Sequence, residues 1–196
     1  MATKRSPYDF YPTPRATIDS LLDTLKKYNI QLGDSILEPC AGDGALIAPL
    51  LDYNPKARIH AYDIDESHLP MLQQLKQTNK IEECGIQDVL TLNPQSYDQF
   101  TAIITNPPFS NTQEILEHLL NMRENSMFKS IRHVIILQRL GFLGSQKRHD
   151  FWNKYPPNAV WAVSKRPSFT GQGTDAHEYG WFIWGDINGA PPILAI

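Results

Sequence analysis

Short runs of β-branched and aliphatic residues alternate along this chain with segments in which apolar residues recur at helical spacing. Such alternation is typical of an α/β fold with a mainly parallel sheet, because parallel strands are joined by crossovers that are usually helices. The run at 133–137 is continuously apolar, as expected for a strand buried on both faces. We expect strands at residues 35–37, 59–62, 83–87, 102–105, 133–137, 159–163 and 181–184.

Helical periodicity occupies most of the intervals between these strands. Thr13 followed by Pro14 predicts the start of a first helix, with Thr13 as its cap, that ends near residue 29. Further helices are expected over 45–53, over 66–76 and around 115–120. A turn-rich segment at 167–173 begins the connection between the last two strands, so these strands are expected to pair antiparallel.

The composition indicates one soluble domain over residues 1–196. Of the 196 residues, 41% are hydrophobic and 20% are charged, and a chain of this length buries about 70% of its extended surface. No apolar run approaches the roughly 20 residues of a membrane span, and the first residues contain no apolar signal core. A cytoplasmic location, in a bacterial cell or phage-infected host, is therefore expected.

The number of cysteines and the net charge argue against a disulfide-stabilised fold, a metal site and an overall attraction to nucleic acid. Cys40 and Cys84 are too few for a disulfide framework and form no C-x-x-C pair, so no metal is expected. The net charge of −3 gives no overall attraction to nucleic acid, which would instead require local basic patches. Each candidate is equally well explained as a solvated surface group; the candidates are Lys4, Arg5, Arg139, Lys147, Arg148, Lys165 and Arg166.

The first motif follows the strand expected at 35–37, and it reads Glu38-Pro39-Cys40-Ala41-Gly42-Asp43-Gly44. Small residues at a strand-to-helix turn let the backbone approach a ligand, at the edge of a parallel sheet where ligands bind. The third glycine of a dinucleotide fingerprint is missing. Glu38 and Asp43 would repel a pyrophosphate but suit an ammonium or sulfonium group. A simple tight turn is the alternative interpretation.

Acidic residues also follow the next two strands. Asp63 lies at the end of the strand at 59–62, where a carboxylate can accept hydrogen bonds from ribose hydroxyls. Asp65, directly before Glu66, fits a helix cap instead. Asp88 follows the strand at 83–87 and could reach an adenine amino group, although by itself it is an ordinary loop acid.

The most specific motif is Asn106-Pro107-Pro108-Phe109, which follows the strand at 102–105. The two prolines end the strand and stiffen the loop. The Asn106 side-chain carbonyl and the Pro107 main-chain carbonyl can then accept from an amino group, which draws the nitrogen lone pair out of conjugation. Phe109 offers a face on which a base can stack, worth roughly 1–3 kcal/mol.

Together these motifs resemble the amino-group DNA methyltransferases, in particular the small adenine-N6 enzymes of phages and prophages. Phe10-Tyr11-Pro12-Thr13-Pro14 resembles the N-terminal motif of that family, in which Thr13 and its neighbours would hold the methionine carboxylate of S-adenosylmethionine. The resemblance covers residues 8 to 185. It implies a Rossmann-like class I fold with a seven-stranded, mainly parallel sheet, the last strand antiparallel, and helices on both faces.

The resemblance also implies residue roles. Catalysis is expected from Asn106, Pro107, Pro108 and Phe109. Cofactor binding is expected from Tyr11, Thr13, Glu38, Pro39, Cys40, Ala41, Gly42, Gly44, Asp63, Ile64, Asp88, Val89 and Asn106. Substrate binding is expected from Phe109 and Phe169, which would sandwich an extruded base. The charge pattern, and not the resemblance, adds Arg139, Lys147, Arg148, Lys165 and Arg166 to the expected substrate-binding residues.

The expected activity is methyl transfer from S-adenosylmethionine to N6 of adenine in DNA, in line and without a covalent intermediate, since neither cysteine lies in the catalytic motif. The residues after 137 are expected to form two strands, so no separate target-recognition domain is expected within residues 1–196. Specificity should therefore be short or relaxed, or supplied by another subunit or by dimerisation of an otherwise monomeric or weakly dimeric chain.

Other functions remain open. The same catalytic motif serves adenine or guanine amino groups in RNA and the glutamine amide of proteins, although glutamine enzymes usually carry Tyr in place of Phe109. A non-catalytic module that binds cofactor or nucleic acid is a second class. A nicotinamide-dependent dehydrogenase is disfavoured by the acidic loop at 38–44 and by the two prolines after Asn106.

Overall fold

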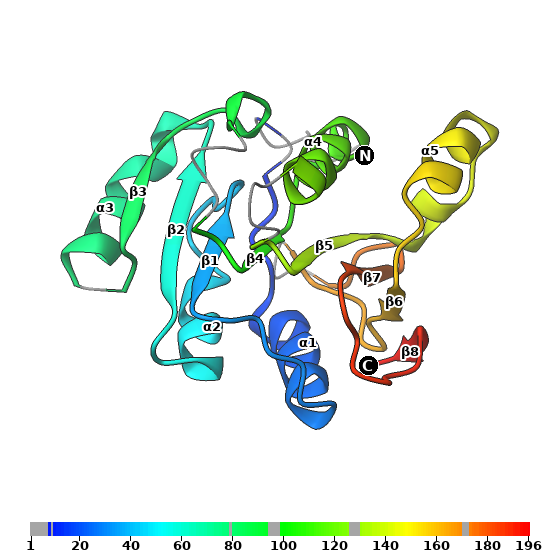
Figure 1. Cartoon of the computed structure of the whole chain (residues 1–196). Helices are drawn as coiled ribbons and strands as arrows, with labels where there is room; N and C mark the ends of the chain where they lie inside the picture. Colours follow the sequence, from blue (N-terminus) through cyan, green and yellow to red (C-terminus); the bar gives the residue numbers. More distant parts are fainter. Residues whose placement is uncertain (1–7, 9, 79, 94–98, 126–129, 170–172) are drawn as a thin grey trace.

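An eight-stranded sheet forms the centre of the computed structural model (Figure 1), which describes residues 8, 10–78, 80–93, 99–125, 130–169 and 173–196. The strands follow one another across it in the order β3-β2-β1-β4-β5-β7-β6-β8. Their bounds are β1 Ser35–Glu38, β2 Arg58–Asp63, β3 Glu83–Ile86, β4 Ala102–Thr105, β5 His133–Arg139, β6 Ala159–Ala162, β7 Tyr179–Trp184 and β8 Ile193–Ala195. The predicted α/β fold with a mainly parallel sheet is confirmed.

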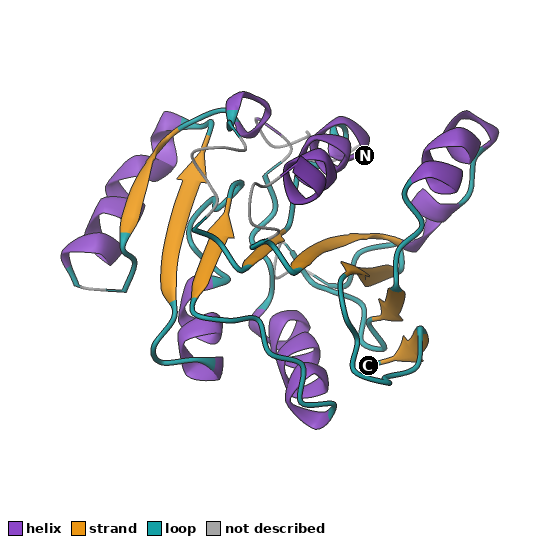
Figure 2. Cartoon of the chain, viewed as in Figure 1, coloured by secondary structure: helices purple, strands orange, loops and turns teal. Residues whose placement is uncertain are grey.

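Helices cover both faces of the sheet (Figure 2). Apolar residues of α1, α2 and α3 pack in one core cluster with alternate residues of the strands, and those of α4 and α5 pack in a second cluster on the opposite face. This two-sided burial explains why all four residues of β1 and of β4 are buried. The bounds are α1 Arg15–Lys27, α2 Ile47–Tyr53, α3 Leu69–Gln77, α4 Thr112–Asn125 and α5 His149–Lys154.

The far end of the sheet contains its antiparallel strand. Strands β1 to β5 pair in parallel, β7 pairs antiparallel with both β5 and β6, and β8 pairs parallel with β6. The predicted antiparallel pair is therefore confirmed, but the predicted count of seven strands is one too few. Strand β8 has three residues and lies at the sheet edge, and its first residue, Ile193, is 82% exposed. Its sequence, Ile-Leu-Ala, shows no alternation of apolar and polar residues by which a strand could be recognised.

One local prediction is wrong. Thr13 does not cap α1: Pro14 occupies the cap position, no side chain of the described residues caps the helix, and the Thr13 hydroxyl bonds elsewhere. Trp152 lies in α5, between β5 and β6. There it packs edge-on against Phe142 and Phe151, and its ring is nearly parallel to that of Phe182.

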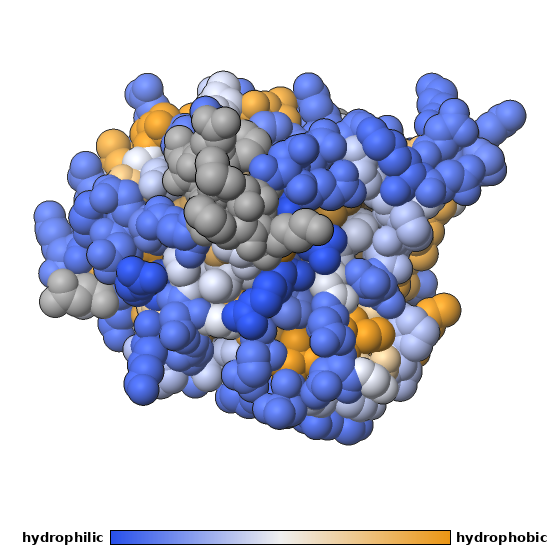
Figure 3. Space-filling model, in the orientation of Figure 1, coloured by the Kyte–Doolittle hydropathy of each residue, from blue (hydrophilic) through white to orange (hydrophobic). Residues whose placement is uncertain are grey.

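Some predictions fall outside the described residues, namely Lys4, Arg5 and positions 170–172 of the turn-rich segment. Among the helices that the structure describes, none has the length and apolar composition needed to cross a bilayer. On the face seen in Figure 3, hydrophilic residues predominate and apolar residues gather in small areas. That face therefore presents no broad apolar surface outside the grey atoms.

Candidate active site

A cavity of about 400 Å³ opens at the carboxyl ends of β1, β2 and β4. Its walls are the loops that follow β1, β2, β3 and β4, together with the N-terminal segment 10–13. Most of the expected cofactor and catalytic residues line it: Tyr11, Thr13, Glu38, Pro39, Cys40, Ala41, Asp63, Ile64, Asp88, Val89, Asn106, Pro107, Pro108 and Phe109. Motifs up to 98 positions apart in the sequence thus meet because parallel strands deliver their loops to one edge.

Glu38 brings a buried carboxylate to this cavity. Its side chain is fully buried, and neither carboxylate oxygen has a hydrogen-bond partner among the described residues. Burial, followed by the negative charges of Asp43 and Asp63, raises the pKa of Glu38 well above its usual range. A buried carboxylate without a partner is costly, so this position fits a ligand that brings a positive charge or N–H donors.

Gly42 shapes the wall without lining it. The residue has φ +55°, and a Cβ added there would overlap the ring of Phe10, which does line the cavity. Gly44 (φ +78°) likewise lies outside the lining, and a Cβ there would press on Leu75. The two glycines were expected to let the backbone approach a ligand; at Gly42 the close approach is made by Phe10 instead.

Asp63 ties the loop after β1 to the end of β2. Its Oδ2 accepts from the Gly42 backbone N–H at 2.7 Å, and its Oδ1 accepts from the Asp65 backbone N–H at 2.8 Å. Each carboxylate oxygen has a second lone pair, so both can still accept from a ligand hydroxyl. His68 Nδ1 lies 3.4 Å from Asp63 Oδ1, and its ring centroid lies 4.4 Å from that of Phe10.

The remaining acids both cap short 3₁₀ helices. Asp65 accepts from the Ser67 backbone N–H at 2.9 Å, as expected of a cap. Asp88 accepts from the Leu90 backbone N–H at 2.9 Å and caps residues 89–91. Asp88 also lines the cavity, as does Val89, whose side chain is buried. The cap therefore holds the Asp88 carboxylate at the cavity wall.

The amide of Asn106 has a defined orientation. Its Nδ2 donates to the Tyr11 main-chain carbonyl at 3.0 Å and to Thr13 Oγ1 at 3.0 Å. Because a carbonyl only accepts, the nitrogen of the amide must face Tyr11. Asn106 Oδ1 is consequently directed away; it is buried and has no hydrogen-bond partner among the described residues. Asn106 Oδ1 is therefore an available hydrogen-bond acceptor beside the cavity.

Phe109 belongs to an aromatic cluster. The Tyr11 ring is nearly parallel to it, at 15° and 5.8 Å between centroids, and the Arg139 guanidinium lies 4.8 Å from its centroid. Phe169 is brought to the same cluster, 6.2 Å from Phe109, but at 67°, and its side chain is 9% exposed. Edge-on rings at this distance do not form the expected sandwich, for which the two rings must be parallel with room for a base.

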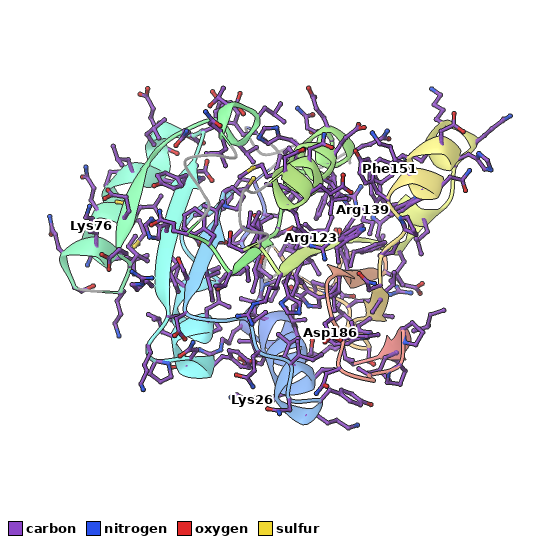
Figure 4. All side chains as sticks on the ribbon, viewed as in Figure 1. Lys26, Lys76, Arg123, Arg139, Phe151 and Asp186 are labelled. Atoms are coloured by element: carbon purple, nitrogen blue, oxygen red, sulfur yellow. The ribbon has the colours of Figure 1, made fainter. Side chains whose placement is uncertain are left out.

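The basic residues expected to bind substrate are distributed unevenly. Arg139, at the end of β5 and labelled in Figure 4, also donates from Nε to the Tyr179 hydroxyl at 3.2 Å. Arg148 donates to the carbonyls of Phe142 and Gly144, and Arg166 pairs with Glu178 at 3.2 Å. Lys147 and Lys165 are exposed, and none of these five side chains lines the cavity.

Sequence reasoning missed His68 as a cavity residue, and no pattern distinguishes it from any other early helix residue. The Cys40 thiol is a cavity group of another kind, since burial raises its pKa above its usual range. A thiol in that state is a poor nucleophile, because the thiolate is the reactive form. Among the described residues, no three His, Cys, Asp or Glu side chains cluster as metal ligands.

The strand order, the antiparallel β7 and the cavity at the carboxyl ends of the strands define a Rossmann-like methyltransferase fold. Solved structures share it at low identity. A putative RNA methyltransferase from Pyrococcus horikoshii matches with a TM-score of 0.67 and 14% identity, over 94% of this chain and 91% of that one. A type I restriction-modification methyltransferase subunit from Streptococcus thermophilus gives 0.65 and 13%, over 94% and 47%. The N-terminal domain of human METTL16, in complex with SAH, gives 0.62 and 12%, over 90% and 72%.

Residues 16–139 match the family model for the methyltransferase small domain, and the chain belongs to that family. Its cofactor is S-adenosylmethionine. An uncharacterized protein of Mycoplasma pneumoniae is 27% identical over 128 residues, which are 65% of this chain and 28% of that protein. The chain thus spans well under half the length of this curated relative.

Proposed function

We propose that this chain transfers a methyl group from S-adenosylmethionine to the N6 amino group of adenine in DNA, with short or relaxed sequence specificity. The observation that carries the proposal is the Asn106 amide, whose Oδ1 is buried, has no partner among the residues that the structure describes, and is turned away from the two fixed acceptors. An amino group supplies the hydrogen that such an oxygen lacks, whereas a ring carbon does not.

The cavity residues fit S-adenosylmethionine, which supplies an electrophilic methyl group when bound. Its ammonium group would pair with Glu38, whose buried oxygens have no other partner in the described part of the chain. Asp63 would accept from the ribose hydroxyls, and the wall that contains Ile64, Asp88 and Val89 would hold the adenine. This arrangement would place the methionine end of the cofactor near β1, beside the loop that carries Asn106.

The chemistry assigned to the protein is positioning and electrostatic stabilisation. Asn106 Oδ1, with the Pro107 carbonyl, would accept from the substrate amino group and direct its lone pair at the methyl group. Phe109 would provide the stacking face, and the near-parallel Tyr11 ring and the Arg139 guanidinium hold it in place. Since burial raises the pKa of the Cys40 thiol and neither cysteine lies in the catalytic motif, no covalent enzyme intermediate is proposed.

An amino group in RNA is the second candidate substrate. The acceptor at Asn106 would contact the base and not the sugar, so it does not distinguish the two polymers. One structural neighbour is described as a putative RNA methyltransferase and another as the methyltransferase subunit of a type I restriction-modification system. DNA is preferred because the motifs Phe10-Tyr11-Pro12-Thr13-Pro14 and Asn106-Pro107-Pro108-Phe109 occur together, in the order found in the DNA enzymes.

The test is to incubate the protein with S-adenosylmethionine and, separately, unmethylated duplex DNA, single-stranded DNA and RNA, and to identify methylated nucleosides by mass spectrometry. N6-methyladenine from DNA is expected. Methylation of RNA alone would keep the amino-group chemistry and replace the polymer. No methylated nucleoside from any polymer, with the cofactor bound normally, would contradict the proposal and favour a binding module.

Asn106→Ala should lower the rate of methyl transfer roughly 100-fold or more, because it removes an acceptor used in the transition state. Binding of S-adenosylhomocysteine, measured by calorimetry, should change little. Asn125→Ala is the matched control, since the Asn125 amide is exposed and donates to the Asn121 carbonyl of its own helix. Full activity of Asn106→Ala would exclude the proposed mechanism.

A further inference from the structure

The N-terminal segment 10–13 lies between the loop after β1 and the loop after β4, and its residues contact both. Phe10 packs where Gly42 has no Cβ, and its ring meets that of His68. Tyr11 stacks on Phe109 and accepts, through its carbonyl, from Asn106. The segment therefore joins the proposed cofactor side of the cavity to its proposed catalytic side.

Thr13 makes the second contact to the Asn106 amide. Its hydroxyl oxygen lies 3.0 Å from Asn106 Nδ2, across 93 residues of sequence, and the residue is 5% exposed. With the Tyr11 carbonyl taking one N–H and Thr13 the other, both amide hydrogens of Asn106 are used. The amide plane is thereby fixed at two points, and the direction of Oδ1 follows from it.

A threonine before a proline would ordinarily be assigned to the start of the helix. Here Pro14 is the cap residue of α1, and no side chain caps that helix. The Thr13 hydroxyl is thus not required by the helix, while Asn106 needs an acceptor at that point. This contact is unlike the role expected from sequence, in which Thr13 and its neighbours hold the methionine carboxylate.

We propose that Thr13 is a positioning residue that acts through Asn106, by holding the amide so that Oδ1 faces the substrate amino group. This inference rests on the proposed function, because it assigns Oδ1 the task of accepting from that group. Removal of the hydroxyl leaves Nδ2 with one partner instead of two, so the amide can rotate and Oδ1 spends less time in the productive direction.

The experiment compares Thr13→Val, which keeps the shape and removes the acceptor, with Thr13→Ser, which keeps the acceptor. Thr13→Ala serves as a second variant without the hydroxyl if valine impairs folding. Thr24→Val is the matched control: Thr24 is also buried, and its hydroxyl bonds to the Ser20 carbonyl within α1, away from the cavity. Thermal unfolding establishes that each variant is folded.

Three quantities are measured. Single-turnover methyl transfer to the polymer identified above should fall about tenfold in Thr13→Val and recover in Thr13→Ser. The dissociation constant of S-adenosylhomocysteine should change less than about twofold. In the cofactor-free, ¹⁵N-labelled protein, the Asn106 amide signal, assigned by its loss in Asn106→Ala, should exchange with solvent about tenfold faster in Thr13→Val.

The outcomes separate the alternatives. Weaker cofactor binding with an unchanged turnover rate at saturation would place Thr13 in the cofactor site and overturn the proposal. Unchanged exchange of the Asn106 amide in both Thr13→Val and Thr13→Ala would overturn it as well. The amide measurement needs no substrate, so it can confirm that Thr13 holds Asn106 even if the proposed function fails, a failure that full activity of Asn106→Ala would reveal.

Discussion

Two regions of the molecule treat buried polar groups in opposite ways. Three tryptophans of β6 and β7 are buried, and each indole N–H donates to a main-chain carbonyl: Trp161 to Pro191 at 2.9 Å, Trp181 to Thr17 at 3.0 Å and Trp184 to Tyr155 at 3.2 Å. At the carboxyl ends of β1 and β4, both oxygens of Glu38 and Oδ1 of Asn106 are buried without partners among the described residues.

The hydrogen-bonded tryptophans stabilise the fold, whereas the oxygens of Glu38 and Asn106, unpartnered within the described chain, belong to the ligand-binding region. An unpartnered buried polar group costs free energy, whereas a satisfied one contributes to a rigid and uniquely packed core. The tryptophans belong to the second kind, and their contacts join β6 and β7 to α1 and to the loops around them. Glu38 and Asn106 belong to the first kind, and the cost is explained if ligand groups complete their hydrogen bonds.

Glu38→Gln should change the affinity for the cofactor and the stability of the fold in opposite directions. Loss of the carboxylate should weaken binding of S-adenosylmethionine roughly 100-fold in calorimetry, because a buried charge partner is removed. The cofactor-free protein should gain about 1 kcal/mol at neutral pH, measured by urea unfolding. Glu82→Gln, at an exposed position, is the control and should change neither quantity.

The same residue gives a pH dependence whose sign follows from its raised pKa. Burial destabilises the ionised form of Glu38, so the folded protein binds this proton more tightly than the unfolded chain does. The penalty is absent below the unfolded pKa and grows as pH rises to the folded pKa. Glu38→Gln should therefore show no added stability at acidic pH and a gain that appears as pH rises; an equal gain at every pH would contradict this explanation.

The next effect tests the other region. Trp181→Phe removes the hydrogen bond to the Thr17 carbonyl and part of a fully buried ring, and we expect a loss of about 2 kcal/mol in the free energy of unfolding. Affinity for S-adenosylhomocysteine should stay within about twofold of the starting value. Trp152→Phe, at a half-buried indole of α5, should cost less. A large loss of affinity in Trp181→Phe would show that the buried tryptophans also shape the ligand site, contrary to this assignment.

The sequence predicts most of the strands and brings the correct loops to one edge, because apolar runs and motif spacing are local signals. It does not predict α5, which has only six residues, or β8, which has three and is mostly exposed. Short elements carry too little periodicity to be recognised, and these two depend on packing against the rest of the sheet.

At the site, residue identity is predictable and side-chain role is not. Thr13 before Pro14 looks like a helix cap, but its hydroxyl serves a residue 93 positions away. Phe169 does reach Phe109, yet edge-on and not parallel to it. Such outcomes depend on contacts between segments distant in sequence, which neither local propensity nor a motif encodes.

The effect that we expect to be weakest concerns the cavity wall at Gly42. A Cβ on Gly42 would overlap the Phe10 ring, whereas a Cβ on Gly173, also at positive φ (+83°), would meet no atom of the described residues within 4 Å. Both Gly→Ala variants should lose about 1 kcal/mol of stability from backbone strain. Only Gly42→Ala also displaces Phe10 from the cavity wall, so it alone should weaken binding of S-adenosylhomocysteine, by about tenfold. Equal affinities in the two variants would mean that Phe10 belongs to the stable framework and not to the ligand site. The ligand-binding region would then begin at the Glu38 carboxylate.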